Sequence, residues 1–348
     1  MRHPYTIREI ARQSGLSTAT VDRVLNSRGN VRDSTVREVH EAIKDLDRQQ
    51  AQVRIGGRTF MIDIVMQTPE RFSTAVREAL EAELPSLHPA VVRSRFHFRE
   101  TGPPQDLVDT LDKIARRGSQ GVILKAPDVP EIAAAVGRLA AAGVPVVTLV
   151  TDLPHSARLA YVGIDNRAAG ATAAYLLEQW LGDRPGDVLT TISRGSFRGE
   201  EEREMGFRSA MRLTDPRRSL VEVTDSDGLD AAQRDLVLEA LERDGDIVAV
   251  YSMGGGNLAT LDAFDTLGRR CAVFVAHDLD HDNTRLLRER RISAVLHHDL
   301  RQDVRRACQT VMRANKALPD DGPTLPSAIQ VVTPFNLPPD VTAAPFPG

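Results

Sequence analysis

The body of the chain, from about residue 59 onward, alternates between short apolar runs and segments in which apolar residues recur at helical spacing. The apolar runs predict strands at 60–66, 92–98, 121–125, 145–149, 187–192, 220–223, 247–251, 272–276 and 293–297. The segments between them predict helices at 74–84, 107–116, 132–142, 168–181, 201–212, 231–241 and 256–267. Continuous apolar strands joined by helices imply parallel sheets covered on both faces. Because there are too many such units for one domain, we expect two α/β lobes, with a first chain crossing near 163–166.

The N-terminal segment has helical periodicity with clear start and stop signals. Thr6-Ile7-Arg8-Glu9 forms a capping box, in which the threonine accepts from the third helical N–H and the glutamate reaches back to the cap. Gly15 ends this helix, because glycine tolerates the left-handed cap conformation. Ser17 can cap a second helix, and a third helix is predicted to begin near Ser34.

Two helices joined by a short glycine-containing turn form the helix-turn-helix pattern of DNA-binding proteins. In that motif the N-terminal residues of the second helix enter the major groove. Here these residues are short and polar, as a groove-facing surface requires. They are Ser17, Thr18, Ala19 and Thr20, followed one turn later by Asp22 and Arg23.

Charge is divided unevenly along the chain, whose formal net charge is −4. Residues 1–58 hold 11 Lys and Arg against 7 Asp and Glu, so this segment carries +4 and the remainder carries −8. A basic head on an acidic body suggests that the head meets a polyanion.

Composition argues against several other classes of protein. The two cysteines, Cys271 and Cys308, are far apart in the sequence and form neither a disulfide framework nor a metal-finger pattern. The N-terminus lacks the apolar region of a secretory signal, and no apolar run approaches the ~20 residues of a membrane helix. We therefore expect a cytoplasmic protein with no membrane partner, no cofactor and no metal site.

The stretch from Thr6 to Asn26, followed by 31–35 and 39–46, resembles the headpiece of the Lac-repressor family almost position for position. The resemblance implies a double-stranded DNA operator as partner. It implies that Thr18, Ala19 and Arg23 face the bases. The residues expected to hold the head against the DNA backbone, or to pack it there, are Ser17, Thr20, Asn26, Val31 and Thr35, and Thr6 is included in the DNA-binding set.

Two features depart from the family pattern. Asp22 stands where the family usually has serine, so its carboxylate either accepts from a cytosine amino group or turns aside to a neighbouring cation. The family normally follows the third helix with a hinge helix that carries a leucine wedge for the minor groove. Residues 49–59 contain no leucine, although Val53 or Ile55 could act as the wedge. Gly56 and Gly57 weaken any helix there.

Polar and aromatic residues gather at the predicted carboxyl ends of the strands, where α/β folds bind ligands. These residues are Gln67, Arg71, Phe72, Thr151, Asp152, Phe197, Arg198, Arg203, Asn257, Asp278 and His298. Carboxylate and amide groups bridge vicinal hydroxyls, arginine donates two parallel hydrogen bonds, and an aromatic ring covers an apolar face. The combination suits a polyhydroxylated ligand.

The body resembles the ribose-binding type of periplasmic sugar-binding protein, as joined to Lac-family heads, on the segments 144–149, 161–166, 203–207, 251–257 and 275–278. By this resemblance the ligand arginine, asparagine and aspartate are Arg203, Asn257 and Asp278, and a glutamine common near the second crossover falls on His298. Val150 stands where family members often carry an aspartate, so Asp152 is the expected substitute.

The chain is therefore identified as a Lac-repressor-family regulator, expected to be a repressor, with a sugar or polyol effector and a homodimeric or higher assembly. The expected parts are a headpiece at 1–48, a hinge at 49–58, a two-lobed body at 59–338 and a tail at 339–348. Lobe 1 takes about 59–163 and 299–325, and lobe 2 takes about 164–297 and 326–338.

Other functions remain open on the sequence. Gly254-Gly255-Gly256 follows a strand but lacks the spacing of a nucleotide-binding loop. Acidic and histidine clusters at 277–282 and 297–299 could suggest a metal hydrolase, without a helical metal-binding spacing. A periplasmic transport receptor is a rival interpretation, but the missing secretory signal and the DNA-binding head both argue against it. A further alternative is an α/β enzyme with an accessory DNA-binding head. A ligand-turnover assay would distinguish such an enzyme from a sensor, because a sensor releases its ligand unchanged.

Overall fold

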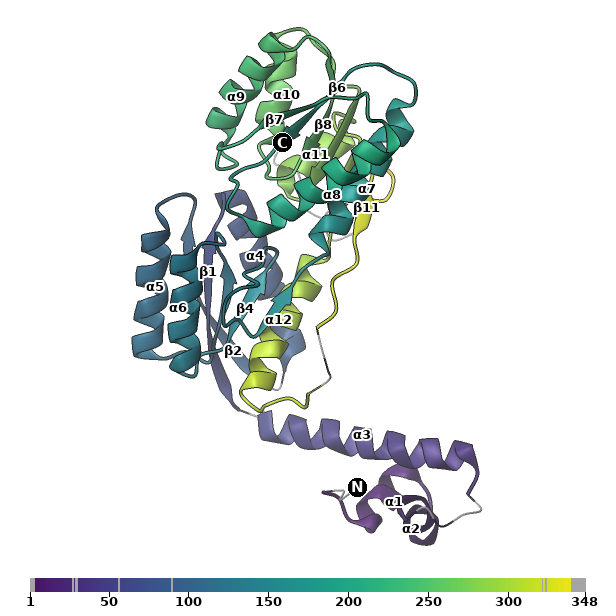
Figure 1. The fold of residues 1–348 in the computed structure, drawn as a ribbon. Helices are drawn as coiled ribbons and strands as arrows, with labels where there is room; N and C mark the ends of the chain where they lie inside the picture. Colours follow the sequence, from purple (N-terminus) through teal and green to yellow (C-terminus); the bar gives the residue numbers. More distant parts are fainter. Residues whose placement is uncertain are drawn as a thin grey trace, which may run out of the picture.

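The computed structural model describes residues 4–26, 28, 31–55, 57–88, 90–320, 322 and 324–338, without the side chains of 48–55. It has a small helical head and a body of two α/β lobes, which follow one another along the molecule (Figure 1). The predicted fold class, parallel sheets flanked by helices behind a helical N-terminal domain, is confirmed. The expected tail at 339–348 lies outside the described residues.

The head consists of α1 (Ile7–Ser14), α2 (Thr18–Leu25) and α3 (Asp33–Ile55). The predicted capping box at Thr6 and the left-handed cap at Gly15 are both present. Ser17 caps α2, as predicted. The small core of the head is formed by Ile10, Ala11, Val21, Val39 and Ala42. The backbone of α3 continues as one helix through 49–55, the segment expected to form the hinge, while the wedge candidates Val53 and Ile55 lie outside the described side chains.

Lobe 1 is a five-stranded parallel sheet in the order β2-β1-β3-β4-β5. Its strands are β1 (Thr59–Gln67), β2 (Val91–Arg99), β3 (Gly121–Lys125), β4 (Val146–Leu149) and β5 (Ala160–Val162). One face is covered by α4 (Glu70–Glu83) and α12 (Leu300–Ala314), and η1 (Leu84–Leu87) follows α4. The other face is covered by α5 (Pro104–Arg117) and α6 (Pro130–Ala141). Because α12 comes from the far end of the chain, the lobe is assembled from two separate segments.

Lobe 2 is a six-stranded sheet in the order β11-β10-β9-β8-β6-β7. Its strands are β6 (Asp187–Thr191), β7 (Leu220–Val223), β8 (Ile247–Ser252), β9 (Val273–His277), β10 (Ala294–His297) and the antiparallel β11 (Gln330–Val332). One face is covered by α7 (Asn166–Leu181) and α8 (Arg198–Thr214). The other is covered by α9 (Asp230–Arg243), α10 (Asn257–Thr266) and α11 (His281–Arg288).

The sequence prediction gave no bounds for β5, β11, α11 and α12. The two strands have three residues each, too few to show a period. By contrast, α12 buries Val304, Ala307, Cys308 and Val311 at regular helical spacing, so that signal was present in the sequence and was overlooked.

Three chain segments connect the lobes. The first passes through Gly163 and Ile164, the second follows β10 at His298, and the third passes through Ser327 on the way to β11. Ile164 pairs with Ser327, whose N–H donates to the carbonyl of Gly163 at 2.8 Å. The first and third connections therefore run side by side, and the second reaches them through the contacts of His298 with Asp303 and of Asp303 with Ser327. This makes the connections the natural axis for relative movement of the lobes.

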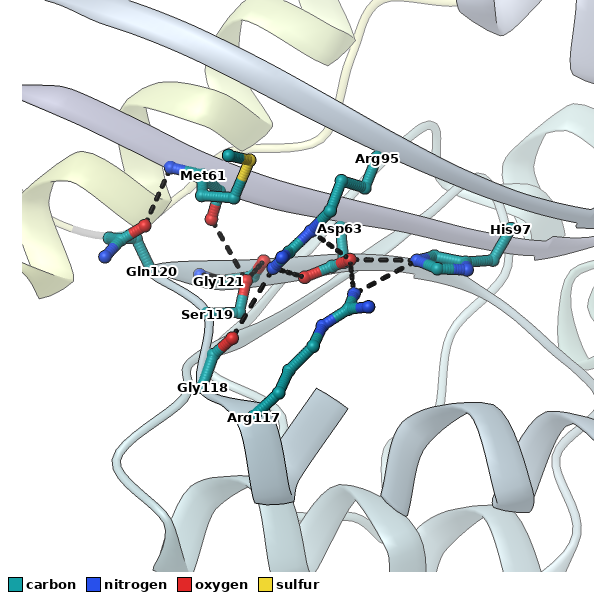
Figure 2. A network of polar contacts seen from close by, with 9 residues as sticks. All are labelled: Met61, Asp63, Arg95, His97, Arg117, Gly118, Ser119, Gln120 and Gly121. Atoms are coloured by element: carbon teal, nitrogen blue, oxygen red, sulfur yellow. Dashed lines mark hydrogen bonds and ion pairs between the residues drawn. The ribbon is translucent and has the colours of Figure 1, made fainter. Parts of the chain in front are cut away.

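A buried carboxylate fixes the outer edge of the lobe 1 sheet (Figure 2). Asp63 on β1 accepts hydrogen bonds from Arg95 at 2.8 and 3.0 Å, pairs with His97 Nε2 at 2.8 Å, and also accepts from Arg117 at the end of α5. Burial alone would raise the pKa of Asp63, but the hydrogen bonds from Arg95 and His97 and the charge of Arg117 outweigh it and lower the pKa. One carboxylate thus joins two strands and a helix.

We expect Asp63→Ala to lower the free energy of unfolding by about 3 kcal/mol, because it leaves two arginines converging on a site with no counter-charge. Thermal melting should show the loss. Asp112→Ala is the matched control, since Asp112 pairs with the half-exposed Arg138 and its loss should change stability by less than about 1 kcal/mol. Equal melting temperatures for the two variants would contradict this role for Asp63.

Candidate functional site

The exposed end of α2 forms the candidate DNA-binding surface. Ser17, Thr18 and Ala19 are exposed at its N-terminus and Arg23 is exposed one turn on, while Val21 is buried in the head core. The Ser17 hydroxyl accepts from the N–H of Thr20 at 3.1 Å, so the helix presents an ordered first turn. Thr20, Val31 and Thr35 are half-buried beside this surface, and Asn26 is exposed.

The departure at Asp22 is accommodated within the head. Its carboxylate lies 2.9 Å from Arg28 and accepts from the Asn26 amide at 2.7 Å. Of the two alternatives for Asp22, the protein alone adopts the one in which the carboxylate turns to a neighbouring cation. Thr6 is likewise engaged locally, because its N–H donates to Glu9 at 2.7 Å.

The second candidate site is a cavity between the lobes. It lies at the carboxyl ends of β1, β3 and β4 in lobe 1 and of β6, β8 and β9 in lobe 2. The sequence-predicted residues that line it are Gln67, Arg71, Phe72, Thr151, Phe197, Arg203 and Asp278. The structure therefore brings together seven side chains from four separate stretches of the chain.

Four predicted effector residues do not line the cavity. Asp152 is held away by Thr148 at 2.8 Å and by Arg158 at 2.6 Å. Arg198 pairs along its own helix with Glu202 at 3.0 Å. Asn257, just after the glycine cap of α10, donates to Asn283, and His298 stands behind Asp278. All four side chains make contacts within the protein, although Oδ1 of Asn257 is buried without a hydrogen-bond partner in the described part of the chain.

Arg203 is held from two sides by neutral partners. Its Nε donates to the side chain of Asn166 at 2.8 Å, and its Nη1 donates to the carbonyl of Met253 at 2.9 Å. Gly170 on α7 allows this placement, because a Cβ there would lie 1.9 Å from the carbonyl oxygen of Arg203. The close approach of α7 to α8 thus fixes the backbone that carries the arginine.

Lys125 is a cavity residue that the sequence reading missed, because it ends an apolar strand and looked like part of it. Its ammonium lies 4.3 Å from the ring centre of Phe197 and 5.7 Å from that of Phe72. Burial lowers the pKa of Lys125 to about 8, although the charges of Glu200 and Asp278 oppose the shift. The cavity therefore holds a cation between two aromatic rings.

Further polar groups that the sequence reading missed lie around the same cavity. Both carboxylate oxygens of Glu200 accept from Ser193, at 2.6 and 2.7 Å. His277 is buried, its Nε2 lies 2.8 Å from the hydroxyl of Tyr251, and its Nδ1 has no hydrogen-bond partner within the described part of the chain. His277 therefore adds a buried imidazole to the cavity lining.

Among the residues that the structure describes, no group of three or more His, Cys, Asp or Glu side chains is placed to hold a metal ion. No helix in the described residues is both long and apolar enough to cross a membrane.

Comparisons with known families agree with this two-part geometry. Residues 64–317 match the model of the periplasmic binding protein domain. Residues 6–48 match the model of bacterial regulatory proteins of the lacI family. The chain belongs to the lacI family. A comparison with curated protein sequences gave no match to this regulator.

Solved structures share the fold of the regulator's body. GanP, a glucose-galactose binding protein from Geobacillus stearothermophilus, is 18% identical with a TM-score of 0.71, over 81% of this chain and 99% of its own. A candidate LacI transcriptional regulator from Bacteroides fragilis is 16% identical with a TM-score of 0.70, over 80% and 98%. A solute binding protein from Agrobacterium vitis with bound D-fucose is 19% identical with a TM-score of 0.70, over 81% and 98%.

Arg71 of this regulator bridges the two lobes. It lies on α4 of lobe 1, and its guanidinium donates to the carbonyl of Gly228 in lobe 2 at 2.8 Å. Its Nε is 3.5 Å from Asp280, and its Nη1 is 3.9 Å from Asp230. Burial raises the pKa of Asp280 to about 6 against the hydrogen bond from Asn283 and the charge of Arg71. The Arg71–Asp280 attraction is therefore present above about pH 6 and weakens below it.

We expect Arg71→Ala to shift the free protein toward an open arrangement by about 1 kcal/mol, because it removes a lobe-to-lobe ion pair. Distances between spin labels on the two lobes, measured by pulsed EPR, report the shift. Arg77→Ala is the control, since Arg77 stacks on Phe96 within lobe 1 at 4.0 Å. Identical distance distributions in the two variants would show that Arg71 does not hold the lobes together.

Proposed function

We propose that this protein is a sequence-specific DNA-binding transcriptional regulator whose operator affinity is set by a small polyhydroxylated ligand held between the lobes. The observation that carries the proposal is the presence, in one chain, of an exposed helix-turn-helix surface and an interlobe cavity lined by charged and aromatic groups. Neither feature alone separates a regulator from a receptor or an enzyme.

The chemistry of the cavity favours a sugar or polyol. Asp278 can accept from hydroxyl groups, while Arg203 and Lys125 can donate to ring and hydroxyl oxygens. Phe72 and Phe197 offer apolar faces for the C–H face of a sugar ring. The likeness of the body to a glucose-galactose binding protein and to a protein with bound D-fucose supports the same class of ligand.

The DNA side of the proposal follows from the head. Thr18, Ala19 and Arg23 read base edges, and Ser17, Thr20, Asn26, Val31 and Thr35 contact or support the phosphate backbone. One head is too small for tight specific binding, so we propose a homodimer on two half-sites. A protein that binds an operator must reach the DNA inside the cell, so we propose that it acts in the cytoplasm.

Closure of the lobes around the ligand carries the signal in this proposal. The ligand can change operator affinity only by its differential affinity for the two lobe arrangements, typically about 1–3 kcal/mol of coupling. The ligand dissociates without being chemically converted, and this distinguishes a sensor from an enzyme.

The function is tested by selecting an operator from a random duplex library and measuring its affinity with and without D-glucose, D-galactose, D-fucose and myo-inositol. At least one of these compounds should raise the melting temperature and change operator affinity. A protein lacking residues 1–58 should keep the thermal shift and lose the operator. Conversion of the compound into a product, or operator binding by the truncated chain, would contradict the proposal.

We expect Arg23→Ala to relax preference at one base pair in each half-site, because a bidentate arginine contact to guanine contributes about 1–3 kcal/mol of discrimination. Affinities for a set of single-base operator variants measure this. An equal loss on all sequences would instead identify Arg23 as a phosphate contact.

We expect Asp278→Ala to weaken binding of the active compound by about 1.5–3 kcal/mol, the range of a charged hydrogen bond. Operator affinity without ligand should hardly change, since the head is untouched. Calorimetric titration measures the loss, and Asp282→Ala is the control, because Asp282 lies on α11 and does not line the cavity. Unchanged affinity in a destabilised Asp278→Ala protein would remove Asp278 from the site.

A further inference from the structure

A row of polar side chains behind the cavity starts at Asp278. His298 lies between Asp278 of lobe 2 and Asp303 on α12 of lobe 1, with Nε2 at 3.5 Å from Asp278 Oδ1 and Nδ1 at 2.5 Å from Asp303 Oδ2. His298 is 2% exposed and does not line the cavity. His298 therefore contacts the predicted ligand-binding carboxylate of Asp278 on the side away from the cavity.

The row continues into the hinge. Asp303 is fully buried, and its other oxygen accepts from the Ser327 hydroxyl at 2.5 Å. Arg306 donates to the same hydroxyl at 3.1 Å and lies 3.8 Å from Asp303. Since the Ser327 N–H donates to Gly163, the row contacts all three segments that connect the lobes.

The two neighbours of His298 determine its protonation state. A neutral imidazole has one N–H and one lone pair, so it can donate to only one of two carboxylates. Each nitrogen of His298 faces a carboxylate. Both nitrogens can therefore donate a proton to the carboxylate they face only when the imidazole is doubly protonated. The positive charge then lies between two carboxylates, and both His298 and Asp303 are buried.

We propose that His298 is a protonated positioning residue that holds Asp278 in its ligand-binding orientation and couples it to the hinge through Asp303 and Ser327. The inference rests on the proposed function, because it concerns the carboxylate assigned to the effector. It goes beyond that function, because it gives the effector site a direct polar link to the axis of lobe movement.

The surrounding charges agree with this arrangement. Burial alone would lower the pKa of His298, but the hydrogen bond with Asp303 and the close negative charge of Asp278 raise it to about 9. Burial would raise the pKa of Asp278, but His298 and the charges of Arg203 and His277 lower it. Arg306 faces Asp303 from the lobe 1 side. The charged form of Asp278 is thus stabilised by its surroundings.

The first experiment observes the proton and needs no ligand. In the full chain labelled with ¹⁵N-histidine, one of the nine imidazoles should remain doubly protonated at pH 8. This signal should disappear in His298→Gln, and its titration midpoint should fall in Asp278→Asn, which provides the assignment if His298→Gln does not fold. If every histidine that responds to either substitution is neutral at pH 8, the proposal is overturned.

The second experiment tests coupling to the ligand by a double-mutant cycle in the full chain, with D-fucose as the probe. His298→Gln keeps a hydrogen-bonding side chain without the charge, and we expect it to weaken D-fucose binding about tenfold or more. In an Asp278→Asn background the same substitution should have almost no effect, because His298 acts through Asp278. His155→Gln, an exposed histidine outside the cavity lining, is the control and should leave affinity unchanged.

The outcomes separate this inference from the proposed function. Equal losses from His298→Gln in the wild-type and Asp278→Asn backgrounds would assign His298 a general structural role and overturn the proposal. If wild-type protein binds neither D-fucose nor the other compounds of the panel, the sugar assignment fails. The imidazole titration then still decides whether His298 carries the proton between the two carboxylates.

Discussion

The arrangement of the body depends on the place where its three connecting segments are linked to one another. Gly163 and Ser327 are joined by a backbone hydrogen bond, and His298 leaves lobe 2 beside them. Because the connections are close together, the lobes meet along one cleft, and the carboxyl ends of both parallel sheets open into it. The loops at these ends carry backbone and side-chain groups that need partners, so charge gathers where the lobes touch. This topology therefore produces a polar site whose width depends on the relative position of the two lobes.

Burial of so many charges in one region is tolerated because most of them are paired within the chain. Arg71 meets Asp280, His298 stands between Asp278 and Asp303, and Glu200 accepts two bonds from Ser193. Arg203 and Lys125 differ, because Arg203 is held by neutral groups and Lys125 by aromatic rings. These two cations are therefore the parts of the cavity best able to exchange their present contacts for those of a ligand.

The sequence predicted the fold well, since most strands of both sheets show as apolar runs and the head carries unmistakable caps. It also predicted that Arg203, on α8, and Asp278, just after β9, belong to the site, and both line the cavity. It failed where the contacts of a polar side chain are decided by three-dimensional packing. Asp152 has a side chain suited to ligand binding, but it accepts a hydrogen bond from Arg158 instead. Lys125 ends an apolar strand, and its position near the rings of Phe197 and Phe72 is visible only in the folded structure. Such pairings are fixed by packing, which a linear pattern does not contain.

The late position of α12 has a consequence for synthesis on the ribosome. Val311 on this helix fills the space beside Gly121 of β3, and Arg301 and Arg305 pair with Glu83 of α4. The strands of lobe 1 therefore emerge long before the helix that completes their core, and the intervening chain must first be translated. The head, whose three helices are consecutive, can fold as soon as it leaves the exit tunnel. A nascent chain thus carries a folded DNA-binding head before the ligand-binding body is complete. A product truncated before α12 would keep the head and lack a complete body to respond to the ligand.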